Sequence, residues 1–153
     1  MTSILLQLAR FRDWLLGQGN EESPHLALGR RGEDMAVGHL KTHGHKVLRR
    51  NFRAPHGGEV DIVCRDKNRN ELVFIEVKTR SSDQFGDPHE AVDRKKRQLI
   101  LRGAMAWLRM LDMPDITFRF DVIEVILDED APDPSPDIRH HEDAFPLPDR
   151  YTY

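Results

Sequence analysis

The sequence predicts an α/β fold in which helices flank a central mixed β-sheet. Segments with helical periodicity and segments with strand character follow one another in the order helix, three strands, helix, strand. The chain has 153 residues, of which 39% are hydrophobic, and this is enough for one domain with a sizeable core. These observations together indicate one small α/β domain.

Residues 1–27 are predicted to form an amphipathic helical extension at the N-terminus. Its apolar residues recur at helical spacing, and they are Ile4, Leu5, Leu8, Phe11, Trp14 and Leu15. Such a stripe packs on the body of the protein or on a protein partner, or it lies on a membrane surface. The main domain is expected at 28–127. Residues 128–153 are predicted to form an acidic, proline-rich tail that begins with a flexible linker. Whether its last segment, AFPLPDRYTY, docks back on the domain is left open.

Two helices are predicted within the main domain. The first runs from Leu28 to His43 and has Gly44 as its C-terminal cap. Its buried stripe consists of Ala36, Val37 and Leu40. The second runs from Pro88 to Leu111, with Asp87 as the N-cap and proline at the first helical position.

Four strands complete the predicted domain. Residues 46–53 form the first strand, and the turn APHGG follows it. Residues 59–65 and 71–79 form a hairpin around the polar turn DKNRN. Both faces of 71–79 are apolar through most of its length, which is typical of a central strand. Residues 116–127 alternate well enough for a last strand.

Charge is distributed unevenly along the chain. Residues 29–109 contain 18 Lys and Arg against 11 Asp and Glu, a net charge of +7, whereas residues 128–153 carry a net charge of −6. A basic body suits a polyanionic partner such as nucleic acid, and a solvated surface is the plainer explanation.

The remaining totals restrict the class of protein. The single cysteine, Cys64, excludes an internal disulfide and a cysteine-based zinc cluster. No signal peptide is evident, so a cytoplasmic location is expected. No apolar run approaches the roughly 20 residues of a membrane span, so no membrane partner is expected.

The hairpin carries charged side chains where a strand normally carries core residues. Asp61 stands among valine and isoleucine in the first strand, and Glu76 and Lys78 do so in the second. In the simplest register Asp61 lies opposite Glu76, and cross-strand neighbours are about 5 Å apart. Two carboxylates at that distance repel each other, and partial burial adds a desolvation cost.

A divalent cation would remove this repulsion. Mg²⁺ prefers hard oxygen ligands, which Asp61, Glu76 and the carbonyl oxygen of Val77 can supply. Lys78 lies on the same strand face as Glu76, where it can hold an attacking water and neutralise a phosphate. The plainer alternative is an Asp–Lys–Glu ion-pair cluster at a strand end, although clustered charges of this kind favour a functional site.

Five sequence blocks carry a resemblance to known proteins. In order, they are GRRGEDMAVGHL, RRNFRAPHGGEVDIVCRD, LVFIEVKTR, FGDPHEAVDRKKRQLI and RFDVIEV. They resemble the bacterial YraN-like family, which is similar to archaeal Holliday-junction resolvases, and the hairpin resembles the PD-(D/E)xK motif of restriction-endonuclease-like nucleases. Val60 stands where that motif name has proline.

The resemblance implies a restriction-endonuclease-like fold over 28–127 and a role for each matched residue. Glu33 corresponds to the acidic residue of the first helix and so joins the catalytic and metal-binding set. Asp61 and Glu76 correspond to metal ligands for Mg²⁺ or Mn²⁺, and Lys78 to the catalytic lysine. Glu59 and Arg80 flank them and are expected to assist.

The predicted function is that of a metal-dependent endonuclease acting on DNA, with branched DNA as one substrate. The expected nucleic-acid contacts are Arg49, Arg50, Arg53, Arg80, Arg94, Lys95, Lys96 and Arg97. A non-cleaving nucleic-acid-binding module and a protein-interaction adaptor are the alternatives. A homodimer, and a protein partner for the N-terminal helix, are left open.

Two smaller groups of residues are weaker candidates for a site. Phe85 and Trp107 could stack on bases, although Trp107 fits the apolar stripe of its helix and is expected in the core. His39 and His43 have the spacing of a zinc-binding pair on a helix, with His45 close by. No third ligand is evident, so surface histidines are the favoured interpretation.

Overall fold

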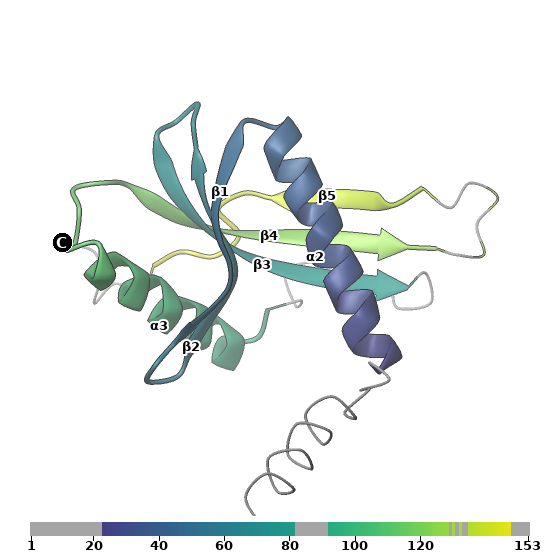
Figure 1. Cartoon of the computed structure of the whole chain (residues 1–153), viewed down its shortest axis with the longest axis horizontal. Coiled ribbons are helices and arrows are strands. Elements are labelled where there is room, and N and C mark those ends of the chain that lie inside the picture. The colour runs from purple at the N-terminus through teal and green to yellow at the C-terminus, as the bar shows by residue number, and fades with distance from the viewer. Residues whose placement is uncertain (1–22, 82–91, 129, 131, 133–134, 148–153) are drawn as a thin grey trace, which may run out of the picture.

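The computed structural model of the chain describes residues 23–81, 92–128, 130, 132 and 135–147. Within these residues, two helices flank a five-stranded mixed sheet, as Figure 1 shows. The helices are α2 (Pro24–Thr42) and α3 (Arg94–Met110). The strands are β1 (His45–Ala54), β2 (Gly58–Asp66), β3 (Glu71–Ser81), β4 (Phe118–Leu127) and β5 (Asp137–His141). The predicted α/β class is confirmed, and the architecture is consistent with a nuclease-like fold. The N-terminal stripe at 1–22 and Phe85 lie outside the described residues.

The strands follow one another across the sheet in sequence order, from β1 to β5. All neighbouring pairs are antiparallel except β3 and β4, which are parallel. Two parallel neighbours need a long crossover, and α3 lies in the connection between them. β3 is therefore central, as the two apolar faces of its sequence predict.

Each face of the sheet has its own apolar core. On one face, α3 covers Phe74, Phe120 and Val122, and Trp107 packs at the edge of this cluster, in the core as predicted. On the other face, α2 covers residues that alternate with these, including Ile75 and Ile123. The buried residues of α2 are Gly32, Ala36 and Leu40, while Val37 is only partly buried.

Glycines allow both helices to approach the sheet closely. A Cβ atom at Gly32 would overlap the side chain of Thr79 in β3. A Cβ atom at Gly58 would overlap the backbone of Gly103 in α3, so the start of β2 and the middle of α3 touch almost directly. This second contact holds α3 against the strand that carries Asp61.

The predicted start of the first helix is four residues too late. The helix begins at Pro24, with Ser23 as its N-cap, because the Ser23 side chain accepts a hydrogen bond from the N–H of Leu26 and proline fits the first turn. The predicted C-terminal glycine is confirmed, since Gly44 follows the helix in the left-handed region with a φ of 84°.

The predicted start of the long helix is also wrong. It begins at Arg94 and not at Pro88, because Asp93 is the N-cap and accepts a hydrogen bond of 2.8 Å from the N–H of Lys96. Asp87 and Pro88 lie outside the described residues.

Part of the expected tail belongs to the domain. β5 pairs with β4, so the sheet extends past the boundary predicted at residue 127. Beyond it, the Ala144 N–H donates to the Phe120 carbonyl at 2.8 Å, and the Phe145 ring stacks on Phe120 with centroids 4.9 Å apart. Phe145 is 5% exposed, so burial of this aromatic ring fixes a segment that a proline-rich, acidic composition does not predict.

Candidate active site

The two hairpin carboxylates lie where regular pairing between β2 and β3 ends. Paired residues run from Asp66 and Glu71 to Ile62 and Ile75, so the predicted register is confirmed. One step further the pairing stops, and the Asp61 Oδ2 atom accepts a hydrogen bond of 2.8 Å from the N–H of Val77, next to Glu76. A side chain thus replaces the backbone bond at this point, and the strands separate beside two carboxylates.

Glu76 is buried without a full set of partners. It is 2% exposed on the α3 face of the sheet. Its Oε1 atom lies 3.0 Å from Lys78 Nζ. Its Oε2 atom lies 3.3 Å from Lys96 Nζ, which is an ion-pair distance, yet it has no partner in hydrogen-bond geometry. Burial, and then the charge of Asp61, raise the pKa of Glu76 to about 7 against the opposing effect of the two lysines.

Lys96 of α3 reaches into this cluster. Its ammonium group donates to Glu59 at the start of β2 and lies close to Glu76. Burial acts to lower the pKa of Lys96, but the hydrogen bond to Glu59 and the nearby carboxylates raise it. The close contact between Gly58 and Gly103 brings α3 near enough for this side chain to act as a counter-cation.

Glu33 lies at the edge of the same region, in the third turn of α2. Its Oε2 atom accepts a hydrogen bond of 3.0 Å from the Asn51 side chain, and Arg50 lies 3.6 Å away. Asn51 falls between the paired positions of β1 and β2, so it faces Asp61, and it has a φ of 49° in the left-handed region. Glu33 therefore contacts the residue opposite Asp61, and its role as a metal ligand stays a prediction.

Comparison with known proteins gives the family of the chain. A family model described as "Uncharacterised protein family UPF0102" matches residues 32–125. The chain belongs to this family. The predicted YraN-like resemblance, which is the same family, is thereby confirmed.

Relatives in the UPF0102 family match most of the chain. A UPF0102 protein of Trichlorobacter lovleyi is 41% identical over 133 residues, which cover 87% of this chain and 97% of that protein. One from Geobacter sulfurreducens is 44% identical over 133 residues, covering 86% and 97%. One from Syntrophotalea carbinolica is 48% identical over 100 residues, covering 65% and 79%. The matched range of the family model contains Glu33, Asp61, Glu76 and Lys78.

Two residues of this UPF0102 site were not predicted. Glu124 of β4 is 2% exposed and stands beside Lys78 in the parallel register. His141 Nε2 lies 3.0 Å from one of its oxygens, and Arg80 lies 3.6 Å from the other. A glutamate inside the apolar run VIEVI is the same signal as Glu76 inside FIEVK, so Glu124 could have been found; His141 could not, because its strand was expected to be a linker.

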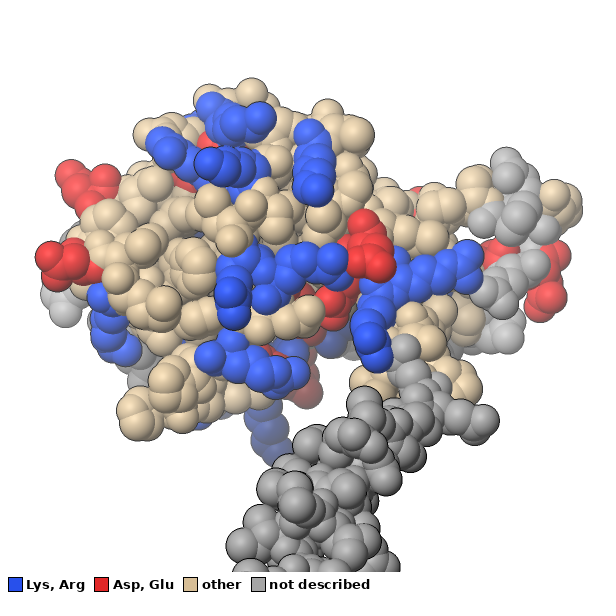
Figure 2. All heavy atoms as spheres, in the orientation of Figure 1, with Lys and Arg blue, Asp and Glu red and all other residues tan. Residues whose placement is uncertain are grey.

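The predicted basic contacts divide into two groups. Arg49, Arg94 and Lys95 are exposed. The others make ion pairs or ring contacts within the protein: Arg50 with Asp34, Arg53 and Lys96 with Glu59, Arg80 with Glu124, and Arg97 with the Phe145 ring. Figure 2 shows the face that α2 crosses, on which lysine and arginine outnumber acidic side chains. The face that α2 crosses is therefore basic.

Two structural absences hold for the described part of the chain. Among these residues, no helix is both long enough and apolar enough to cross a membrane. Nor do three or more His, Cys, Asp or Glu side chains there already converge as a metal site. Asp61 and Glu76 are nevertheless near enough for the charge of Asp61 to raise the pKa of Glu76.

Proposed function

We propose that this UPF0102 protein is a metal-dependent endonuclease that hydrolyses phosphodiester bonds in DNA, with branched DNA as the first substrate class to test. The observation that carries the proposal is the buried Glu76 carboxylate, which has one oxygen without a hydrogen bond and lies beside Asp61 and Lys78. Clustered groups with a strongly shifted pKa are characteristic of functional sites.

The donor set fits a hard divalent cation. Asp61 and Glu76 would hold Mg²⁺ or Mn²⁺, with the Val77 carbonyl oxygen and Glu33 as further oxygen donors. The Glu76 oxygen without a hydrogen bond, and the burial and Asp61 charge that raise the Glu76 pKa, are the costs that a bound cation would relieve. The cation would supply Lewis-acid chemistry, which activates water and stabilises the charge on phosphate.

The side chains of the protein would act around that cation. Lys78 holds one Glu76 oxygen, and the same ammonium group can orient an attacking water and neutralise the phosphate. Lys96 keeps Glu59 and Glu76 in place from the α3 side. Arg94 and Lys95, which are exposed in the first turn of α3, would contact the DNA backbone next to the site.

The second candidate is a nucleic-acid-binding module that does not cleave. It is favoured by the absence of a preformed three-ligand cluster within the described residues. Under this alternative, the lysines alone neutralise Glu76, and the exposed arginines bind nucleic acid without a cation. A protein-interaction adaptor would depend on the N-terminal stripe, which lies outside the described residues.

The test uses the full chain on four-way junctions, duplex DNA, single-stranded DNA and RNA, each with Mg²⁺, Mn²⁺ or EDTA. Asp61→Asn and Glu76→Gln should abolish cleavage and leave nucleic-acid binding within a few-fold of wild type, because neither removes a cationic side chain. Asp115→Asn, which alters an exposed carboxylate in the turn before β4, is the matched control. Cation-independent binding with no cleavage of any substrate would favour the second candidate.

A further inference from the structure

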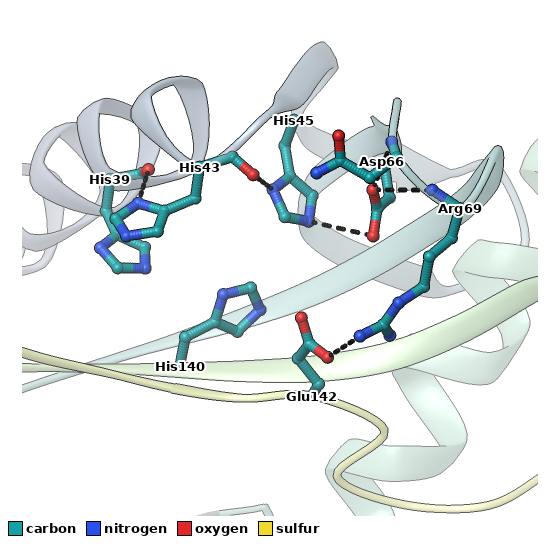
Figure 3. A pocket seen from close by; sticks show the side chains of 8 residues that line it. His39, His43, His45, Asp66, Arg69, His140 and Glu142 are labelled. Atoms are coloured by element: carbon teal, nitrogen blue, oxygen red, sulfur yellow. Dashed lines mark hydrogen bonds and ion pairs between the residues drawn. The ribbon is translucent and has the colours of Figure 1, made fainter.

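A second group of titratable side chains lies on the opposite face of the sheet. Four histidines from three elements surround a pocket of about 470 Å³: His39 and His43 at the end of α2, His45 in β1, and His140 in β5. Figure 3 shows their rings on one side of the pocket and Asp66, Arg69 and Glu142 on the other. The interpretation of His39 and His43 as plain surface residues is therefore incomplete, because β5 brings the further ring that the sequence lacked.

Hydrogen bonds leave one ring nitrogen available on three of these histidines. His43 Nδ1 lies 2.8 Å from the His39 carbonyl oxygen, and His45 Nδ1 lies 3.1 Å from the His43 carbonyl oxygen. His140 Nε2 lies 2.8 Å from a carboxylate oxygen of Asp121. Carbonyl and carboxylate oxygens accept, so the bonded nitrogen donates and the other nitrogen of a neutral ring keeps its lone pair. Metal-binding histidines are held in this way.

His45 supplies a more specific indication of a ligand. It is 6% exposed, and its Nε2 atom has no hydrogen-bond partner although it lines the pocket. The nearest carboxylate oxygen, on Asp66, is 3.8 Å away, beyond hydrogen-bond distance. A buried ring nitrogen without a partner is costly, and a bound cation would satisfy it.

The charges around the pocket favour a cation over an anion. Asp66 and Glu142 line it, and Arg69 is already paired with Glu142 at 2.7 Å. Carboxylates beside imidazole rings suit a divalent cation and would repel an anion.

The ring spacing is close to what a shared ion requires. Two imidazoles on one tetrahedral zinc, with nitrogens at about 2.1 Å, have ring centres roughly 5 Å apart. The centroid of His140 lies 5.7 Å from that of His39 and 5.7 Å from that of His45. His39 and His43 are stacked at 4.0 Å, so one of these rings must rotate before three nitrogens meet. This explains why the described side chains do not yet converge on one point.

We propose that this pocket binds one transition-metal ion of the imidazole-preferring class, with Zn²⁺ as the physiological candidate, through His45, His140 and one or both histidines at the end of α2. Imidazole ligands select Zn²⁺ and its neighbours and not Mg²⁺, so the site differs in chemistry from the carboxylate pair. The proposal is independent of the endonuclease function. The ion would join α2, β1 and β5, and so would fix the last strand to the domain.

The experiment titrates Co²⁺, and then Zn²⁺ in competition, into the untagged full chain after treatment with EDTA. We expect one equivalent of Co²⁺ to give the visible absorption of a four-coordinate ion, and Zn²⁺ to abolish it. No thiolate charge-transfer band is expected, since burial raises the pKa of the Cys64 thiol to about 12. His140→Ala, and the double variant His39→Ala with His43→Ala, should each weaken Zn²⁺ binding at least about tenfold.

Three controls make the result decisive. His25→Ala and His56→Ala, which change exposed histidines away from the pocket, should bind Zn²⁺ as wild type does, and so should Asp115→Asn, which changes an exposed carboxylate before β4. Equal affinity in the pocket variants and the wild type would overturn the proposal. If His140→Ala does not fold, the test is made on the wild type instead. Its histidines are modified by diethyl pyrocarbonate with and without Zn²⁺, and the protection of each histidine by Zn²⁺ is measured. Protection of His25 or His56 without protection of the pocket histidines would then refute the site.

Discussion

Both faces of the sheet bury carboxylates next to cations, and the two clusters differ in how completely those carboxylates are satisfied. On the α2 face, Asp121 is fully buried and accepts hydrogen bonds from Arg119, His140 and the Asp143 N–H. On the α3 face, Glu76 is equally buried but keeps one oxygen without a hydrogen bond.

The pKa values of the two carboxyl groups follow this difference. For Asp121, burial acts to raise the pKa, but its hydrogen bonds lower it below the ordinary value. For Glu76, burial and Asp61 prevail and raise the pKa to about 7. A buried carboxylate with a full set of hydrogen bonds stabilises the fold. A buried carboxylate that lacks a hydrogen bond destabilises it, and a bound cation or substrate can remove that destabilisation. The comparison predicts that mutations of the Asp121 cluster mainly change stability and that mutations of the Asp61–Glu76 pair mainly change activity.

The largest expected effect is on the α3 face. Asp61→Ala or Glu76→Ala should reduce DNA cleavage by roughly 1,000-fold or more, because each change removes a charged oxygen donor from the site. Electrophoretic binding assays should show little change in affinity. Cleavage by Asp61→Ala at the wild-type rate would remove the carboxylate pair from the mechanism.

On the α2 face, Arg119→Met should lower the free energy of unfolding by about 3–5 kcal/mol, because it leaves buried carboxylates unpaired. Arg119 bonds to Asp66, Glu71 and Asp121. Urea denaturation measures the change. Arg139→Met, which breaks an exposed pair with Asp137, is the control and should cost about 0–1 kcal/mol. Similar losses in both variants would contradict the distinction between the two clusters.

The pH dependence of stability should come from Glu76. Its pKa is about 7 in the folded state and near the ordinary 4.5 in the unfolded state, so the folded state binds more protons between these values. Stability without cation should therefore fall as pH rises through this window. Mn²⁺ competes with the proton, so it should raise the melting temperature more at about pH 8 than at about pH 6. Glu76→Gln should remove both trends, and a trend that survives in this variant would assign it to another group.

Glu33→Gln should have a smaller effect on cleavage, about tenfold, since the carboxylate contacts the site through Asn51. The glutamine keeps the shape and removes the charge. Asp34→Asn, in the neighbouring exposed position on α2, is the matched control. Comparing cleavage at rising Mg²⁺ concentrations separates the outcomes: an unchanged Mg²⁺ dependence would leave Glu33 with a structural role only.

The smallest effect concerns the exposed start of α3. Replacing Arg94 and Lys95 by glutamine should weaken duplex binding without regard to sequence. It should also flatten the salt dependence by about 0.9 log unit for each phosphate that these side chains no longer neutralise. Arg97→Gln should instead act on stability, because Arg97 packs over Phe145. An unchanged salt slope in the double variant would make Arg94 and Lys95 an ordinary solvated surface.

The elements and the pairing of the hairpin follow from the sequence alone. Apolar periodicity predicted α2, α3 and four strands to within a few residues, except at the start of α3, where Asp87 was predicted as the N-cap and Asp93 is the observed one. The short turn between β2 and β3 sets their register, and so it brings Asp61 to the Glu76–Val77 end of the hairpin. These are local features, because a tight turn and alternating side chains leave one register available.

Which distant side chains meet depends instead on the tertiary packing. The contact between Gly58 and Gly103 brings Lys96 into the carboxylate site, although its sequence context indicates a solvated basic turn. The pairing of β5 with β4 brings His141 to Glu124 and His140 to the other histidines. Neither contact can be predicted from the residues around it in the sequence. In the tail, an acidic, proline-rich segment becomes ordered only because burial of Phe145 and pairing with a free sheet edge compensate the lost chain entropy.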